Sequence, residues 1–481
     1  MKRLSLLLLT LFSVLTAFSQ AFESHRASSL FVLPQTDSDI VFIGNSITNL
    51  HNWNEAFGGA RILNRGISGE TTAGLETRLP AYIDGQPKKI FLMLGTNDFE
   101  PSVNKTPAQI ARTMRAVIRR IVETCPATEL YVQSILPSTY KTRTLAGIEA
   151  TNTLLKNFID SLADSRVTYL DIHSLLSGIA GPADRSLSYD GLHLTAKAYS
   201  IWCHALEPYI GLKTVYPNPA TMTLRDGGLS STPGMRATMC AALPVNPDDV
   251  LVIGGEMLAG GEWWELLGDS RVKNRACGWW QANVSLDEVN AMLTPIFHDG
   301  ATPAKVFLYV GANEMNGNTT VDVAMTKYRN IVGRIRALSP TTDIYLLSLV
   351  PTADASRNTN KYVPFNSRLQ VYAEATDGVT FIDIYTPLVK NGVANPDYIA
   401  DNYLQGRGYA VVAGRMGACL PGCQPVTEEE ACERESARRA AIENILPAPS
   451  TPCKDTRCGV APLPQSQLSS PLVSTSVTAK K

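Results

Sequence analysis

The sequence contains the same pattern twice. Residues 236–254 read RATMCAALPVNPDDVLVIG, and residues 26–44, which lie 210 positions earlier, read RASSLFVLPQTDSDIVFIG. The match continues along the chain, where residues 305–314 resemble residues 89–98. Because a repeat this long corresponds to a complete structural unit, we predict two copies of one domain in tandem. The length of 481 residues agrees with this, since it exceeds what a single hydrophobic core usually supports.

Within each copy, strand-like segments alternate with helical ones. Short β-branched and aromatic runs in the first copy predict strands, and amphipathic patterns predict helices. The predicted strands are residues 40–43, 90–94, 130–135 and 168–172, and the predicted helices are residues 107–123 and 147–163. Such alternation is typical of a parallel sheet with helices on both faces. We therefore predict an α/β fold of two tandem three-layer α/β/α domains.

The domain boundaries follow from the repeat and from composition. A segment rich in Pro, Gly, Ser and Thr separates the copies, and the repeated pattern stops near residue 420. The predicted parts are a signal peptide at 1–20, the first copy at 21–212, a linker at 213–233, the second copy at 234–418, and a Cys-containing, Pro- and Ser-rich tail at 419–481. Within that tail, residues 428–445 are expected to form one charged helix.

The amino terminus predicts export from the cell. Lys2 and Arg3 precede an apolar run at residues 4–18, and Ala17 and Ser19 are small residues at a typical cleavage position. This apolar run is too short for a convincing membrane-spanning helix. We therefore expect a periplasmic, secreted or cell-surface protein with no inserted membrane segment.

Charge and composition exclude several classes of partner and cofactor. The 43 basic and 44 acidic residues leave a net charge of -1, so no field exists to attract nucleic acid or anionic lipid. No CxxC or HExxH motif occurs and only 6 histidines are present, so neither a metal nor another cofactor is expected. The 9 cysteines of an exported chain can form disulfides, but their odd number leaves at least one without an internal partner.

Three residues of the first copy predict a nucleophilic site. Ser46 follows the strand at residues 40–43, and in open α/β sheets the carboxyl ends of the strands are where ligands bind. A serine becomes a nucleophile only when a base takes its proton, and His193 is a candidate base. Asp190 stands three residues before it and can hold the imidazole in the required tautomer. The alternative is an N-cap serine and a solvated surface loop.

Acyl transfer also needs hydrogen-bond donors for the developing oxyanion, and two candidates follow other strands. Gly66 comes after a short predicted strand and has no side chain, so its N–H can approach a ligand closely. Asn97 follows the strand at residues 90–94 and offers a side-chain amide. Together with Ser46, both are expected at one edge of the sheet.

These short segments resemble the ordered sequence blocks of the SGNH (GDSL-like) hydrolases, a family of flavodoxin-like esterases and lipases. The matching segments are Gly44-Asn45-Ser46, Gly66, residues 95–98 and residues 190–193. The resemblance implies Ser46 as nucleophile, His193 as base and Asp190 as its partner. It also implies an oxyanion hole formed by the N–H of Ser46, Gly66 and Asn97. Asn45 departs from the family, which usually has Asp there.

The second copy serves as an internal control. Glu256 stands at the position of Ser46, Ala276 replaces Gly66, and residues 401–405 contain no histidine. We therefore interpret the second copy as catalytically degenerate. Several residues are nevertheless retained where the reaction cannot occur, and these are interpreted as packing residues: Trp53, Glu55, Asn64 and Arg65. His51 is not retained, so it is a candidate substrate contact, with a solvated loop position as the alternative.

The resulting hypothesis is a secreted serine esterase. The segment at residues 64–72 is similar to platelet-activating-factor acetylhydrolase-like proteins and to bacterial sialate O-acetylesterases, which implies an O-acetylated carbohydrate substrate such as sialic acid. A short-chain lipid ester, or another ester cleaved by a carboxylesterase or lysophospholipase, is the alternative. Two further alternatives concern binding. The second copy is a non-catalytic module that either binds glycan or packs against its neighbour, and Trp279 and Trp280 either stack on a sugar or fill the vacated pocket. Alternatively, the whole chain is a receptor with a relic site.

Overall fold

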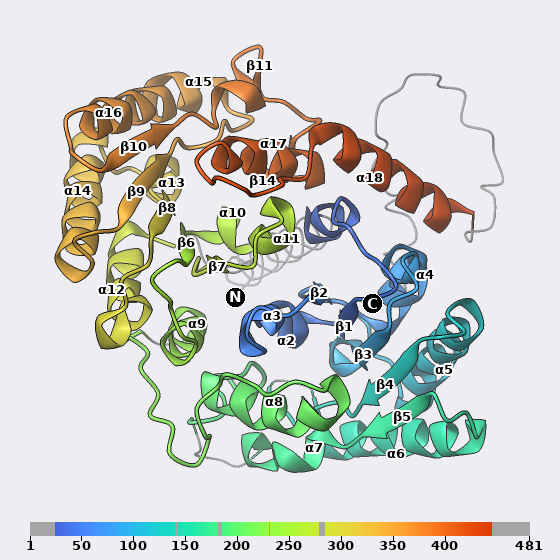
Figure 1. Ribbon diagram of the computed structural model, residues 1–481. Coiled ribbons are helices and arrows are strands. Elements are labelled where there is room, and N and C mark those ends of the chain that lie inside the picture. Colours follow the sequence, from blue (N-terminus) through green and yellow to red (C-terminus); the bar gives the residue numbers. More distant parts are fainter. Residues whose placement is uncertain (1–24, 141–142, 181–184, 230, 279–283, 445–481) are drawn as a thin grey trace, which may run out of the picture.

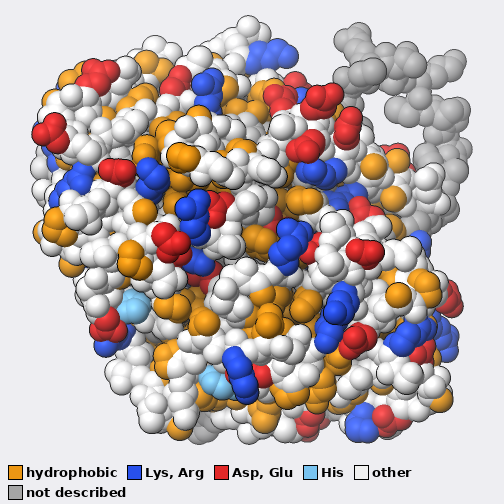
Figure 2. All heavy atoms as spheres, in the orientation of Figure 1, with side chains coloured by type: hydrophobic (Ala, Val, Ile, Leu, Met, Phe, Trp, Pro, Cys, Tyr) orange, Lys and Arg blue, Asp and Glu red, His pale blue; other side chains and the backbone are white. Residues whose placement is uncertain are grey.

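The structure is a computed structural model that describes residues 25–140, 143–180, 185–229, 231–278 and 284–444. The expected signal peptide and the pair Trp279 and Trp280 lie outside the described residues. Two five-stranded sheets form the framework, one in each copy (Figure 1). The face in Figure 2 shows acidic and basic side chains intermixed, as the net charge of -1 suggests.

The first sheet has the strand order β2-β1-β3-β4-β5, and all its pairs are parallel. Its strands are β1 (Ile40–Gly44), β2 (Ile62–Gly66), β3 (Lys89–Met93), β4 (Glu129–Gln133) and β5 (Val167–Leu170). The main helices around it are α4 (Thr72–Ile83), α5 (Pro107–Thr124), α6 (Leu145–Leu162) and α8 (Ala196–Ile210). The shorter helices are α2 (Ser46–Asn49), α3 (Trp53–Ala56), η1 (Thr96–Phe99), α7 (Ile172–Leu175) and η2 (Ser177–Ala180). The strand order is that of flavodoxin-like folds.

The second sheet repeats this topology, with the order β7-β6-β8-β9-β10. Its strands are β6 (Val250–Gly254), β7 (Val272–Asn274), β8 (Lys305–Tyr309), β9 (Asp343–Leu347) and β10 (Val379–Ile382). The main helices are α12 (Leu286–Ile296), α14 (Val321–Leu338), α16 (Val363–Glu374) and α17 (Gly406–Gly417). The shorter elements near the interface are α10 (Glu256–Ala259) and α11 (Trp263–Leu267). The prediction of two tandem α/β domains with parallel sheets is confirmed.

Each copy packs its leading helix against the other copy. Residues 25–31 are helical, and the Ser28 hydroxyl accepts a hydrogen bond from the Gly406 N–H at the start of α17 (2.9 Å). In the same way, α9 (Ser231–Ala242) begins the second copy and packs against both α12 of its own copy and α8 of the first copy, where its Thr238 hydroxyl accepts from the Ala196 N–H (3.0 Å). Figure 1 shows α9 beside α8. Each leading helix therefore lies between the two copies and contacts both of them.

Two buried ion pairs join the copies with the same reciprocity. Arg65 binds both oxygens of Glu265, at 2.9 and 2.8 Å, and Arg275 binds Glu55 at 2.6 Å. Arg275 and Glu265 occupy in the second copy the positions of Arg65 and Glu55 in the first. A contact in which residue i meets j and j meets i is the mark of two-fold symmetry. The interpretation of Glu55 and Arg65 as packing residues therefore agrees with their place in this interface.

The region after the second copy contains the helix expected there. α18 (Glu428–Glu443) places Arg438 against the Asp84 carboxylate at the end of α4 (2.7 Å). The same guanidinium donates to the carbonyls of Leu30, Phe31 and Leu33, which end the leading helix. α18 thus joins the end of this leading helix to α4 of the first copy.

The cysteines and the hydropathy of the helices add two observations. The seven cysteines of the described ranges are all free thiols, and Cys453 and Cys458 lie outside those ranges. Over the described residues, no helix combines the length and the apolar character that crossing a membrane requires.

Candidate active site

Ser46 stands at a tight turn between β1 and α2. The Asn45 side chain caps the helix by accepting a hydrogen bond from the Ile47 N–H (3.0 Å). Gly44 ends the strand, where an added Cβ would come within 2.7 Å of the Met93 carbonyl on β3. Backbone crowding therefore requires glycine here and presents Ser46 at the carboxyl edge of the sheet.

The structure brings together the three residues that the sequence predicted as a unit. His193 Nε2 lies 3.0 Å from Ser46 Oγ, and His193 Nδ1 lies 2.7 Å from Asp190 Oδ2. The other carboxylate oxygen of Asp190 accepts from the backbone N–H groups of Leu192 (2.9 Å) and His193 (2.8 Å). This loop precedes α8, so base and orienting carboxylate arrive together on one short segment. A serine, an imidazole and a carboxylate in this order can perform nucleophilic catalysis.

The environment of Asp190 keeps it ionised. Burial by itself would raise its pKa, but the hydrogen bond from His193 and that residue's charge, with the two backbone donors, outweigh burial and lower the pKa of Asp190 to about 2. A carboxylate that remains charged near neutral pH can hold the Nδ1 proton and stabilise an imidazolium.

Asn97 lies at the same edge with a fixed orientation. Its Nδ2 donates to the Glu70 carbonyl (3.0 Å), and its Oδ1 accepts from Arg143 Nη2 (2.9 Å). Because an amide nitrogen carries two hydrogens, one N–H of Asn97 remains for a ligand. Arg143 also binds Glu100 at 2.7 Å and is buried. Sequence reasoning missed Arg143, since no short motif connects it to Asn97.

The prediction that Gly66 donates to the oxyanion is wrong. Its N–H already donates to Asn64 Oδ1 (3.0 Å), and the second copy has the equivalent bond from Ala276 to Asn274 at 3.0 Å. An added Cβ at Gly66 would also lie 2.8 Å from the Cα atom of Asn49. Gly66 is thus required by its close packing against α2.

Gly69, three residues later, is better placed for that role. It adopts φ +86°, which favours glycine. Its neighbour Ser68 donates to Asn49 Oδ1 (3.0 Å), and its other neighbour Glu70 accepts from Asn97. Within the described part of the chain, the backbone N–H groups of Ser46 and Gly69 have no protein acceptor. The sequence contained both glycines in one short segment, and only the tertiary contacts distinguish them.

His51 is not a substrate contact, which corrects the prediction. Its side chain is buried, with the ring stacked on Tyr199 at 4.1 Å and edge-on to Trp53 at 4.5 Å. Burial, with a smaller effect of the Arg236 charge, holds the pKa of His51 well below its ordinary value. His51 is therefore a neutral residue of the aromatic core.

Comparison with known proteins identifies the family. The model of the GDSL-like Lipase/Acylhydrolase family matches residues 42–201 and 257–411. The chain belongs to this family. It is 31% identical over 189 residues to platelet-activating factor acetylhydrolase IB subunit alpha2 of Rattus norvegicus, covering 37% of this chain and 80% of that protein. The bovine alpha1 subunit (Bos taurus) is 26% identical over 181 residues, covering 36% of this chain and 74% of that protein.

The chain is also similar over part of its length to solved structures. One is a mutant of Axe2, an acetylxylan esterase from Geobacillus stearothermophilus, with 16% identity and a TM-score of 0.31 over 37% of this chain and 97% of that one. Another is a GDSL-like lipase from Bacteroides thetaiotaomicron, with 20% identity and a TM-score of 0.31 over 38% of this chain and 94% of that one.

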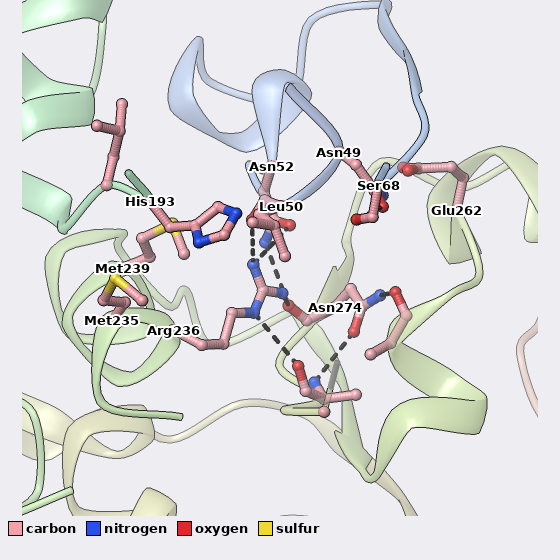
Figure 3. A pocket seen from close by; sticks show the side chains of 14 residues that line it. Asn49, Leu50, Asn52, Ser68, His193, Met235, Arg236, Met239, Glu262 and Asn274 are labelled. Carbon is pink, nitrogen blue, oxygen red and sulfur yellow. Dashed lines mark hydrogen bonds between the residues drawn. The ribbon is translucent and has the colours of Figure 1, made fainter. Parts of the chain in front are cut away.

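Both GDSL-like copies contribute to the pocket at His193. The first copy supplies His193 and Ser68, and the second supplies Met235, Arg236 and Met239 from α9 (Figure 3). Helix α9, which lies between the copies, thus forms one wall of the pocket. Over the described residues, no cluster of three or more His, Cys, Asp or Glu side chains is arranged to hold a metal ion.

The second GDSL-like copy has a carboxyl group where the first has its serine. Glu256 begins α10, and burial raises the pKa of this carboxyl to about 7. Residues 401–405 form a turn and a short strand without histidine, as the sequence already indicated. Since neither a serine nor an imidazole is present at these positions, the second copy lacks the groups for the same reaction.

Replacing Glu256 with glutamine is expected to stabilise the protein in a pH-dependent way. A carboxyl whose pKa rises on folding binds its proton more tightly in the folded state, so stability decreases as pH rises from about 4.5 to about 7. Glutamine has no carboxyl to ionise, so it avoids this loss of stability at high pH. The free energy of unfolding should increase by about 1 to 3 kcal/mol near pH 8, with partial solvent access reducing the effect.

Urea unfolding of both proteins across this pH range measures the difference. The gain should shrink to well below 1 kcal/mol at about pH 4, where both states of the wild type are protonated. An equal gain in the free energy of unfolding at pH 4 and pH 8 would contradict the raised pKa of Glu256.

Proposed function

We propose that the first copy is a serine esterase that removes acetyl groups from O-acetylated carbohydrate, sialic acid being one such substrate, and that the protein acts after export. The observation that carries the proposal is the continuous hydrogen-bond chain from Ser46 through His193 to Asp190. The family membership agrees with ester hydrolysis.

The first half of the reaction forms an acyl-enzyme. His193 Nε2 takes the proton of Ser46 Oγ as this oxygen attacks the acetyl carbonyl carbon. The tetrahedral oxyanion receives hydrogen bonds from the N–H groups of Ser46 and Gly69 and from Asn97 Nδ2. His193 then gives its proton to the departing alcohol oxygen, which leaves an acetyl ester on Ser46. Asp190 stabilises the imidazolium throughout.

The second half restores the enzyme. A water molecule loses a proton to His193 Nε2 and attacks the acetyl carbon of the acyl-enzyme. The second tetrahedral intermediate collapses with release of acetate, and the imidazole returns the proton to Ser46 Oγ. The same donors stabilise both intermediates, so a single oxyanion site suffices for the cycle.

A short-chain lipid ester is the second candidate. The rat relative is named as an acetylhydrolase of platelet-activating factor, which supports an acetyl group as the part removed and a lipid as an alternative leaving group. Both candidates share the acyl-enzyme chemistry and differ only in the alcohol.

Acetate release from a substrate panel tests the proposal. The full chain is incubated with O-acetylated sialic acid, acetylated neutral sugars, a 2-acetyl glycerophospholipid and p-nitrophenyl acetate. We expect the highest kcat/KM among the sugars. A preference for the lipid would support the second candidate. No acetate release from any of these esters would reject an esterase and favour a binding protein.

A further inference from the structure

The pocket at His193 contains a cationic side chain that belongs to the degenerate copy. Arg236, on the interface helix α9, lines the pocket together with His193, and Figure 3 shows both side chains directed toward the same space. Met235 and Met239 of that helix flank it with polarisable apolar surface. Residues far apart in sequence thus meet in one pocket, and the second copy supplies part of its wall beside His193.

Arg236 is held in place from both copies. Its Nη1 donates to the Leu50 carbonyl (3.2 Å) and to Asn52 Oδ1 (3.1 Å) in the first copy. Its Nη2 and Nε donate to the carbonyls of Asn274 (2.5 Å) and Ala276 (3.2 Å) in the second. These acceptors are neutral. They orient the guanidinium but do not cancel its charge.

Arg26, the counterpart of Arg236 in the first copy, does have an anionic partner. Arg26 makes the equivalent carbonyl contacts to Gly66 (3.2 Å) and Gly260 (2.8 Å), but its Nη2 also binds the Glu262 carboxylate at 2.5 Å. The residue equivalent to Glu262 in the first copy is Asn52. Asn52 therefore leaves Arg236 without the carboxylate that its counterpart has.

The other charges around the interface are paired. Arg65 pairs with Glu265 and Arg275 pairs with Glu55, as described above. Asp190 is also ionised, but it contacts the far ring nitrogen of His193 and does not line the pocket. Glu262 also lines the pocket, and its carboxylate is paired with Arg26. Among the described residues, Arg236 is thus the charge of the pocket wall that has no ion-pair partner. A cation in a partly enclosed, low-dielectric site attracts an anionic ligand group more strongly than one in bulk water.

We propose that Arg236 selects esters whose alcohol part carries an anionic group, a carboxylate or a phosphate. The degenerate copy would then act as the specificity element of the active one. This inference rests on the proposed esterase function of the first copy and adds a charge requirement to it. The four contacts above leave one Nη2 N–H of Arg236 for a ligand, and a charge-assisted hydrogen bond from it can be accepted by an oxygen of either group.

Matched substrate pairs test the charge requirement. One pair is 9-O-acetyl sialic acid and its carboxamide, and the other is 1-acetylglycerol 3-phosphate and 1-acetylglycerol. The full-length wild type should hydrolyse the anionic member of at least one pair with a kcat/KM about tenfold or more above that of the neutral member. Which pair shows the preference distinguishes a carboxylate from a phosphate. The preference should decline as salt is raised, since salt screens partly exposed charges.

The variant Asn52→Glu reproduces in the first copy the pairing of Arg26 with Glu262. The added carboxylate should neutralise Arg236 and reduce the anionic-to-neutral ratio of kcat/KM by about tenfold or more. Asn360→Glu, an exposed site on the second copy, adds the same charge elsewhere and should leave the ratio unchanged. Arg236→Lys should keep part of the preference and Arg236→Gln should lose it, with thermal denaturation reporting whether each variant folds.

The outcomes separate the two proposals. Equal hydrolysis of both members in both pairs by the wild type, or an unchanged ratio in a folded Asn52→Glu variant, overturns selection by Arg236 and leaves the esterase proposal intact. A wild type that hydrolyses none of these esters overturns the esterase itself.

Discussion

Replacing Ser46 with alanine is expected to lower kcat for acetyl esters by a factor on the order of 10⁵ to 10⁶. The mutation removes the only atom that forms the covalent bond to the acetyl carbon, and the base and the orienting carboxylate have no function without it. Ser46 is a small side chain, and alanine fits the same turn, so the fold should be retained. Continuous release of p-nitrophenol from p-nitrophenyl acetate measures the change.

Ser68→Ala is the matched control. Ser68 is a second buried serine that lines the pocket beside His193, but its hydroxyl donates to Asn49 instead of contacting the imidazole. Its removal should reduce kcat/KM by less than about tenfold, the effect of one neutral hydrogen bond. If Ser46→Ala kept more than a few per cent of the wild-type turnover, or if Ser68→Ala were the inactive variant, the assignment of the nucleophile would be wrong.

Breaking the buried pair between Arg65 and Glu265 is expected to destabilise the protein by about 3 to 5 kcal/mol. Both side chains are almost inaccessible to solvent, at 1% and 2%, so Arg65→Met leaves the Glu265 carboxylate buried without its cation. Because the pair joins the two copies, the lower free energy of unfolding should appear as a lower midpoint of urea unfolding. The contact between the two copies should be weakened as well.

The double variant Arg65→Met and Glu265→Leu provides the internal comparison. It removes both charges, so most of the lost stability should return, and the double-mutant cycle should give a coupling energy of at least about 2 kcal/mol. The symmetry-related pair of Arg275 and Glu55 should behave alike, since its side chains are just as buried. A loss below about 1 kcal/mol in Arg65→Met would mean that water or another group compensates the carboxylate.

The features that the sequence predicted correctly are those that depend on local sequence patterns. The strands of both sheets and the segment with Asp190 and His193 could be predicted, because alternating hydrophobic patterns and short-range spacing are properties of local sequence. Ser46 and Asn97 could be placed at one sheet edge because parallel strands in an α/β fold end on the same side. The repeat also predicted which residues pack, and Glu55 and Arg65 lie in the interface between the copies.

The errors concern residues whose role depends on distant contacts. Gly66 and Gly69 stand in one short segment with equal claims to an oxyanion donor, and the hydrogen bond from Gly66 to Asn64 decided against the first. His51 is close to Ser46 in sequence, yet its ring packs on Tyr199, which comes from a helix far along the chain. Such assignments require knowing which groups already have partners.

The amino-acid sequence by itself determined the duplicated α/β architecture, the three residues of the catalytic proposal and the absence of their equivalents in the second copy. These depend on local periodicity and on residue identity at matching positions, which a sequence states directly. Only the tertiary structure decided that the leading helices lie between the copies and that Arg236 therefore lines the pocket at His193. That outcome depends on how the two copies pack and how the arginines at their interface, three of them buried, find partners across it. No local sequence pattern encodes such contacts.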